Sequence, residues 1–143
     1  MTSLSFPDIN VWLSLAAPEH VHAAIAKHWW EEESANIAFS RVTQIGFLRL
    51  MTTAQAMDGK PLNMAEAWRV YDRFFEDDRV IFIPEPPDVE KPFRARTAAR
   101  TSSPKMWADA WLLALAEAAE GILVTFDQAL ASRGARCLLA KNR

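Results

Sequence analysis

The sequence has little of several features that mark special classes of protein. Its 143 residues include one cysteine, Cys137, which excludes an intramolecular disulfide and a cluster of thiolate zinc ligands. No apolar run approaches the ~20 residues that a membrane-spanning helix needs. The N-terminus lacks the basic and apolar regions of a secretory signal. The four glycines stand apart, so a glycine-rich phosphate loop is also excluded. We therefore expect a protein of a reducing, cytoplasmic compartment with no membrane part.

The composition is that of an ordinary folded domain. Half of the residues are hydrophobic and 24% are charged, and the length suits one domain spanning residues 1–143. The charge is uneven, because residues 1–90 carry 7 basic against 14 acidic side chains and residues 91–143 carry 9 against 4. Residues 91–105 hold five cations and no acid. Such a run suits a phosphate backbone, although a solvated helix face is its more common meaning.

Short apolar strands alternate with helices along the whole sequence. We expect strands at 4–6, 36–40, 79–83, 122–125 and 136–139, and helices at 9–15, 19–33, 41–53, 64–76, 88–100, 105–120 and 128–132. This alternation predicts an α/β fold with an open, mostly parallel sheet covered on both faces. Ligands of such sheets bind beyond the carboxyl ends of the strands, where the strand order changes direction.

Three aspartates occupy positions that suit a site at that edge. Asp8 follows the first strand, Asp127 follows the strand at 122–125, and Asp109 lies on one of the most apolar helices. If the three converge, their mutual repulsion raises their pKa values and a divalent cation relieves it. Carboxylate oxygens with open positions for water suit Mg²⁺ or Mn²⁺ better than Zn²⁺.

Each aspartate also has a simpler explanation when taken alone. Asp8 and Asp127 are good N-caps for the helices that follow them, and Asp109 can face solvent on an amphipathic helix. Their joint placement favours a site over three separate structural roles.

The segments around these aspartates resemble the motifs of PIN domains. The segments are Asp-Ile-Asn at 8–10, Trp-Ala-Asp-Ala at 107–110 and Thr-Phe-Asp at 125–127. Over its full length the chain is most similar to the VapC ribonuclease toxins of bacterial toxin–antitoxin pairs. The resemblance implies a three-layer α/β/α sandwich, an acidic Mg²⁺ or Mn²⁺ centre, and cleavage of RNA that leaves 5′-phosphate and 3′-hydroxyl ends. It also implies a cognate VapB-like antitoxin and a homodimer.

The resemblance assigns roles to single residues. Asp8, Asp109 and Asp127 match the acidic positions, and Asn10 and Thr125 match polar supporting positions. The family carries a further glutamate on the helix after the second strand, for which this chain offers Gln44. We expect Gln44 beside the acids, with solvent exposure as the alternative. An amide supplies no charge and cannot act as a base, so metal affinity is expected to fall.

Basic residues are the candidates for holding the RNA backbone. They are Arg94, Arg96, Arg100, Lys91 and Lys105, with Arg41 and Arg49 on the helix of Gln44. Two other interpretations stay open. One is a catalytically weakened PIN-like module that binds RNA or a protein, which the amide at Gln44 favours. The other is a receiver-like phosphoacceptor domain, which normally carries adjacent acids after its first strand, whereas here Asp8 stands alone.

Overall fold

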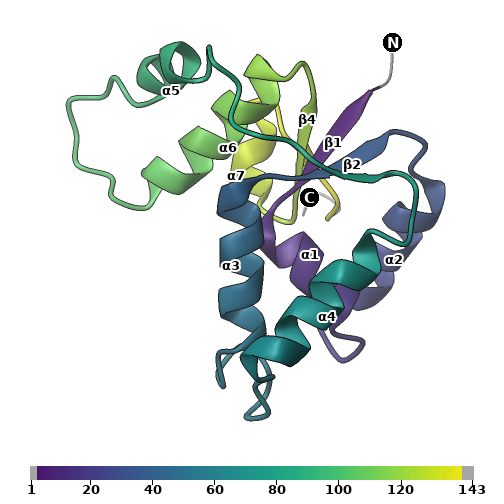
Figure 1. Cartoon of the computed structure of the whole chain (residues 1–143). Coiled ribbons are helices and arrows are strands. Elements are labelled where there is room, and N and C mark those ends of the chain that lie inside the picture. Colours follow the sequence, from purple (N-terminus) through teal and green to yellow (C-terminus); the bar gives the residue numbers. More distant parts are fainter. Residues whose placement is uncertain (1–2, 140–143) are drawn as a thin grey trace.

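Five parallel strands form the central sheet of the computed structural model, which describes residues 3–139 (Figure 1). They are β1 (Leu4–Pro7), β2 (Asn36–Phe39), β3 (Val80–Phe82), β4 (Ile122–Thr125) and β5 (Arg136–Cys137). The order across the sheet is β3-β2-β1-β4-β5, and all the pairings that join these strands are parallel. β1 and β4 therefore lie side by side where the chain order changes direction, which is where a ligand site is expected.

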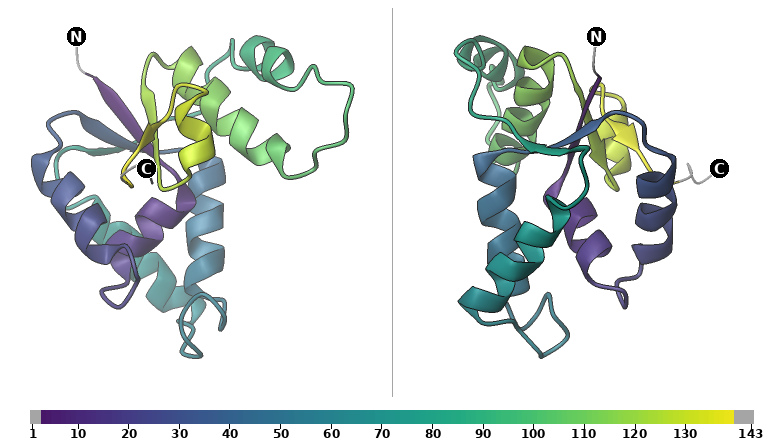
Figure 2. Two further views of the ribbon diagram at one scale, coloured as in Figure 1. Left: turned by 180° about the vertical axis from the view of Figure 1, so that it is seen from behind. Right: turned by 45° about the vertical axis from the view of Figure 1, so that its right-hand side comes forward.

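Helices connect the strands, since parallel neighbours need a long crossover. They are α1 (Ile9–Ala16), α2 (Ala23–Glu32), α3 (Arg41–Met51), α4 (Met64–Phe74), α5 (Glu90–Arg96), α6 (Met106–Ala118) and α7 (Gln128–Ala131). Figures 1 and 2 show α1 to α4 gathered on one side of the sheet, with α5 and α6 on the other. Among residues 3–139, no helix has the length and apolar character needed to cross a bilayer.

Alternate residues of the strands pack into two separate hydrophobic cores. Ile37 and Phe39 of β2 pack among side chains of α1 to α4, and the Phe39 ring stacks on Trp12 with ring centroids 3.7 Å apart. Ala38, which lies between them in β2, belongs to the second core together with Leu115 of α6. This alternation follows from the two-residue period of a strand. The predicted three-layer α/β/α sandwich is confirmed.

Most of the expected helices are shorter than predicted, and two of them differ the most. The helix expected over 88–100 covers only Glu90–Arg96, and a loop at 97–105 follows it. α5 contributes no fully buried residue, and the Thr97 hydroxyl donates to the Phe93 carbonyl at 2.9 Å. With little packing to stabilise further turns, the helix ends there. The helix expected from residue 19 begins at Ala23, because residues 18–22 form turns.

Candidate active site

Asp8, Asp109 and Asp127 line one cavity at the carboxyl edge of the sheet. The cavity has a volume of 480 Å³ and also includes Asn10 and Thr125. Asp8 directly follows β1, and Asp127 lies two residues beyond β4, so the central strand pair delivers both. Asp109 lies in the first turn of α6 and reaches the cavity from the neighbouring layer. Residues far apart in the chain thus meet where the topology predicts a site.

Thr125 links two of these aspartates. Its hydroxyl is buried and donates to Asp8 Oδ2 at 3.1 Å, while it accepts from the Asp127 amide at 3.1 Å. The Asp8 amide donates to the carbonyl of Val124 at 2.8 Å, which continues the β1–β4 pairing up to the aspartate. The position of the Asp8 carboxylate is therefore set by the sheet. Asn10 lies at the same cavity and is exposed to solvent.

Two of the aspartates also cap helices. Asp8 Oδ1 accepts from the Ile9 amide at 2.7 Å at the start of α1, and Asp127 Oδ1 accepts from the Ala129 amide at 2.9 Å at the start of α7. An N-cap uses one carboxylate oxygen for the backbone. Capping and membership of the site therefore coexist in these residues, and the capping bonds hold the carboxylates in place.

The carboxylates of the cavity disfavour one another's charge. Burial raises the pKa of Asp8, and the charge of Asp127 adds to this effect, while hydrogen bonds from Ile9 and Thr125 oppose it. Burial also raises the pKa of Asp109, to which Asp8 and Asp127 add, and Arg133 opposes the rise. Both pKa values lie above their ordinary range, so the chain itself does not fully compensate this concentration of negative charge.

This donor set suits a hard divalent cation. Carboxylate oxygens are the ligands that Mg²⁺ and Mn²⁺ prefer, and a cation relieves the repulsion that raises these pKa values. Among residues 3–139, no three acidic, histidine or cysteine side chains stand close enough together to form a ready-made cage. An open arrangement is compatible with Mg²⁺, which usually keeps several waters and binds proteins through one or two carboxylates. Asp8, Asp109 and Asp127 are the residues that would hold it.

Gln44 does not lie beside the aspartates, contrary to our expectation. Its Oε1 accepts a 2.6 Å hydrogen bond from Arg41, its side chain also bonds to Tyr71 on α4, and it is 7% exposed. The α3 residues that line the acidic cavity include Val42, Gly46 and Arg49. In a helix, a shift of two residues turns a side chain by about 200°, which points Gln44 away from that cavity.

Gly46 lies on the α3 face that looks toward the acids. A Cβ at this position would meet Ile9 Cδ1 and would lie 2.9 Å from Ile9 Cγ1. The side chain of Ile9 therefore fills the space that a larger residue at position 46 would need. The α3 lining of the acidic cavity carries no carboxylate, and its charged member is Arg49.

The predicted RNA-binding residues come from two regions of the fold, α3 and the segment of α5 with the loop after it. Arg41 lies over the Phe82 ring at 4.7 Å, where it also holds Gln44. Arg94 forms an exposed ion pair with Glu90 on its own helix. Arg100, Lys91 and Lys105 are exposed on α5 and the loop after it. Only Arg49 of the predicted cations lines the acidic cavity itself.

Arg133 is a site neighbour that sequence reasoning missed. It follows α7 and lowers the pKa of Asp109, and its carbonyl accepts a 3.3 Å hydrogen bond from Arg96. The signal that was available is its place six residues after Asp127, at the far end of the short helix that Asp127 caps.

Relatives with curated names match almost the whole chain. Residues 5–135 match the family model described as PIN domain. The chain is 38% identical over 133 residues to Ribonuclease VapC41 of Mycobacterium tuberculosis, which covers 89% of this chain and 91% of that protein. It is 31% identical over 131 residues to Ribonuclease VapC44 of the same organism, with 87% and 86% coverage.

Solved structures agree with the observed fold. The crystal structure of Mycobacterium tuberculosis VapC20, a Sarcin-Ricin loop cleaving toxin, superposes with a TM-score of 0.66 at 14% identity and covers 92% of this chain and 95% of that one. FitAcB from Neisseria gonorrhoeae gives 0.55 at 18% identity, with 93% and 96% coverage. At such identities these likenesses show the fold alone, whereas the sequence matches show the family. The chain therefore belongs to the PIN domain family, and within it to the VapC-like toxins.

Proposed function

We propose that this chain is a VapC-type endoribonuclease that hydrolyses RNA phosphodiester bonds with Mg²⁺ or Mn²⁺ bound at Asp8, Asp109 and Asp127. The observation that carries the proposal is the cavity at the β1–β4 edge, where these three carboxylates interact electrostatically. Relatives named as ribonucleases support the choice of reaction.

The chain's own residues prepare the site for that reaction. When bound, a divalent cation lowers the pKa of water and stabilises negative charge on a phosphate. Thr125 and the Ile9 amide orient the Asp8 carboxylate before any ligand arrives, so little reorganisation is needed on binding. Arg49, at the α3 wall of the cavity, is placed to contact a phosphate of the RNA backbone.

A second candidate function follows from the α3 wall. Because its lining residues Val42, Gly46 and Arg49 supply no acid to the cavity, a non-catalytic PIN-like module that binds RNA or a protein is the alternative. The two candidates differ in one property, which is metal-dependent turnover.

Two partners belong to the proposal. We expect a VapB-like antitoxin that places a basic side chain against the acidic cavity, and a homodimer as the working unit. Exposed apolar side chains on neighbouring helices α3 and α4, namely Ile45, Met64 and Trp68, offer apolar surface for such contacts.

The test is hydrolysis of structured and single-stranded RNA with Mg²⁺ or Mn²⁺ by the wild-type chain and by Asp109→Asn, purified in parallel. Cleavage by the wild type that chelation stops and that Asp109→Asn lacks is the expected result. Equal cleavage by both proteins would indicate a contaminant and would remove the proposal. RNA binding without cleavage under every metal condition would favour the second candidate.

A further inference from the structure

A second cavity lies at the start of α6, and we call it the loop pocket. Its volume is 480 Å³, and it forms between the loop at 97–105, the first residues of α6 and Arg133. Figure 2 shows this loop standing away from the rest of the chain. The volume lies within the range of about 300–1,000 Å³ that is usual for sites of small ligands.

The polar lining of the loop pocket suits an anion. Two arginines, Arg96 and Arg133, line it together with Thr101, Ser102 and Ser103. Arg96 is held in place by Glu117 at 3.4 Å and by the carbonyl of Arg133 at 3.3 Å. The guanidinium of Arg133 forms no ion pair with any residue in the part of the chain that the structure describes. Guanidinium groups with hydroxyls are a common phosphate-binding set.

Trp107 gives the loop pocket an aromatic wall. The side chain is 59% exposed, and Phe93 contacts it in an edge-to-face arrangement with ring centroids 6.1 Å apart. This contact restrains the indole while most of its surface stays open to solvent. A restrained, exposed aromatic ring beside cations is the arrangement on which unpaired nucleic acid bases stack.

The loop pocket and the acidic cavity are neighbours. Trp107 lines the first and Asp109 the second, and because the two residues are two positions apart in α6 they point in roughly opposite directions. The short helix α7 joins the two cavities, since Asp127 at its start lines the acidic cavity and Arg133 beyond its end lines the loop pocket. A ligand in the loop pocket therefore lies one short helix away from the acidic cavity.

We infer that the loop pocket binds one nucleotide of single-stranded RNA next to the scissile bond, with its base stacked on Trp107 and its phosphate held by Arg96 and Arg133. This inference rests on the proposed function for the identity of the polymer. It adds a requirement that the acids do not impose, namely that the RNA be unpaired at this position so that a base can leave its stack. The loop pocket thereby selects single-stranded or looped RNA.

The test distinguishes the contribution of base stacking to RNA affinity from the contribution of charge. Affinity is measured by fluorescence anisotropy in EDTA, which prevents metal-dependent cleavage, for labelled oligoadenosine and for an abasic ribose-phosphate oligomer of equal length. Trp107→Ala is expected to weaken oligoadenosine binding about tenfold, the usual scale for loss of one stacked base, and to leave the abasic oligomer unaffected. Arg133→Ala is expected to weaken both and to reduce the salt dependence by about one phosphate contact.

Two variants serve as controls. Trp107→Phe keeps an aromatic face and is expected to restore most of the oligoadenosine affinity, which also reports that the fold is intact. Val21→Ala removes an apolar side chain that is 83% exposed and lies outside both cavities, and it is expected to leave both affinities unchanged.

The inference is overturned if Trp107→Ala binds oligoadenosine like the wild type, or if it weakens both oligomers equally. A Trp107→Ala chain that loses self-association in sedimentation while its RNA affinity is unchanged would assign Trp107 to a protein interface and overturn it as well. If the base-dependent effect of Trp107→Ala is found in a chain that never cleaves RNA, the loop pocket stands and the proposed nuclease activity fails.

Discussion

Partly buried carboxylates lie at the amino edge and at the carboxyl edge of the central sheet, and their pKa values are shifted in opposite directions. At the amino edge, Glu33 is 11% exposed and accepts hydrogen bonds from the Ser5 hydroxyl, the Trp29 indole and the Ala35 amide. Burial alone would raise the pKa of Glu33, but these donors and Arg136 outweigh it and hold the pKa below its ordinary value. At the carboxyl edge, the pKa values of Asp8 and Asp109 are raised.

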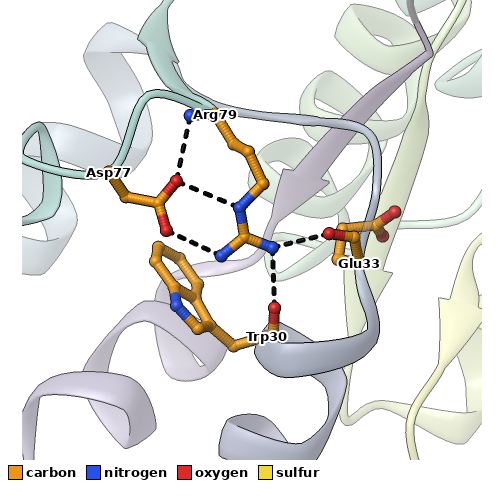
Figure 3. A network of polar contacts seen from close by, with 4 residues as sticks. All are labelled: Trp30, Glu33, Asp77 and Arg79. Carbon is orange, nitrogen blue, oxygen red and sulfur yellow. Dashed lines mark hydrogen bonds and ion pairs between the residues drawn. The ribbon is translucent and has the colours of Figure 1, made fainter.

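A second network strengthens the amino edge. Figure 3 shows that two guanidinium nitrogens of Arg79 donate hydrogen bonds to the two carboxylate oxygens of Asp77. Arg79 also donates to the carbonyls of Trp30 and Glu33, at 2.7 and 2.6 Å. These bonds tie the end of α2 to the turn before β3. Internal partners satisfy the charges of this edge, whereas the charges of the carboxyl edge repel one another. The acids of the amino edge therefore stabilise the fold, and those of the carboxyl edge are suited to a partner from outside the chain.

The largest expected effect is on catalysis. Asp109→Asn should lower the rate of metal-dependent RNA cleavage by at least about 100-fold, as loss of a charged active-site group typically does. Glu33→Gln should leave the rate unchanged, because Glu33 lies at the opposite edge. Initial rates at a temperature where both variants are folded measure this, with exposed Asp72→Asn as a matched control. A large loss of activity in Glu33→Gln alone would mean that the amino edge, and not the carboxyl edge, is needed for catalysis.

The next effect is on stabilisation by metal. Mg²⁺ or Mn²⁺ at about 100 times its dissociation constant should stabilise the wild type by about 2.7 kcal/mol. Thermal melts should show this rise in the wild type and in Glu33→Gln but not in Asp109→Asn. An equal rise in all three would place the ion elsewhere.

The carboxylates of the two edges should change the free energy of unfolding in opposite directions as the pH falls. The raised pKa values mean that Asp8 and Asp109 destabilise the metal-free fold at neutral pH, and this penalty fades as pH falls toward about 4. The lowered pKa of Glu33 stabilises the fold above its unfolded pKa, and this contribution is lost as pH falls through the folded value. Glu33→Gln should cost about 1–3 kcal/mol at pH 7.

Urea unfolding in EDTA measures both effects across this pH range. At pH 7, Asp109→Asn is expected to unfold at a higher urea concentration than the wild type. The difference between the two unfolding midpoints should become smaller at acidic pH. An Asp109→Asn chain that is less stable at pH 7 would mean that the carboxyl edge stabilises the fold.

The smallest expected effect concerns Gln44. Gln44→Glu should change metal-dependent cleavage by no more than about twofold, because the new carboxylate would pair with Arg41 instead of joining the aspartates. Single-turnover cleavage rates test this, with Gln44→Met as a variant of similar volume that removes the hydrogen bonds. A large gain in activity from the glutamate alone would show that position 44 reaches the site.

The contrast between Asp8 and Gln44 shows what the sequence can predict here. The positions of Asp8 and Asp127 in the site can be predicted from the sequence, because each follows an apolar strand and parallel strands end at the same edge of the sheet. The spacing around Gln44 predicts a helix correctly but not its rotation about its own axis, which turns Gly46 toward Ile9 and Gln44 toward Tyr71. The sequence places Arg133 six residues after Asp127 but does not show its approach to Asp109, which is an interaction between two separate elements.

The most direct test of the central claim is the anomalous diffraction of Mn²⁺ in crystals of the wild-type chain. We expect a manganese peak in the cavity beyond β1 and β4, within bonding distance of carboxylate oxygens of Asp8, Asp109 and Asp127. No manganese in that cavity, in crystals of a chain that cleaves RNA with Mn²⁺ in solution, would contradict it.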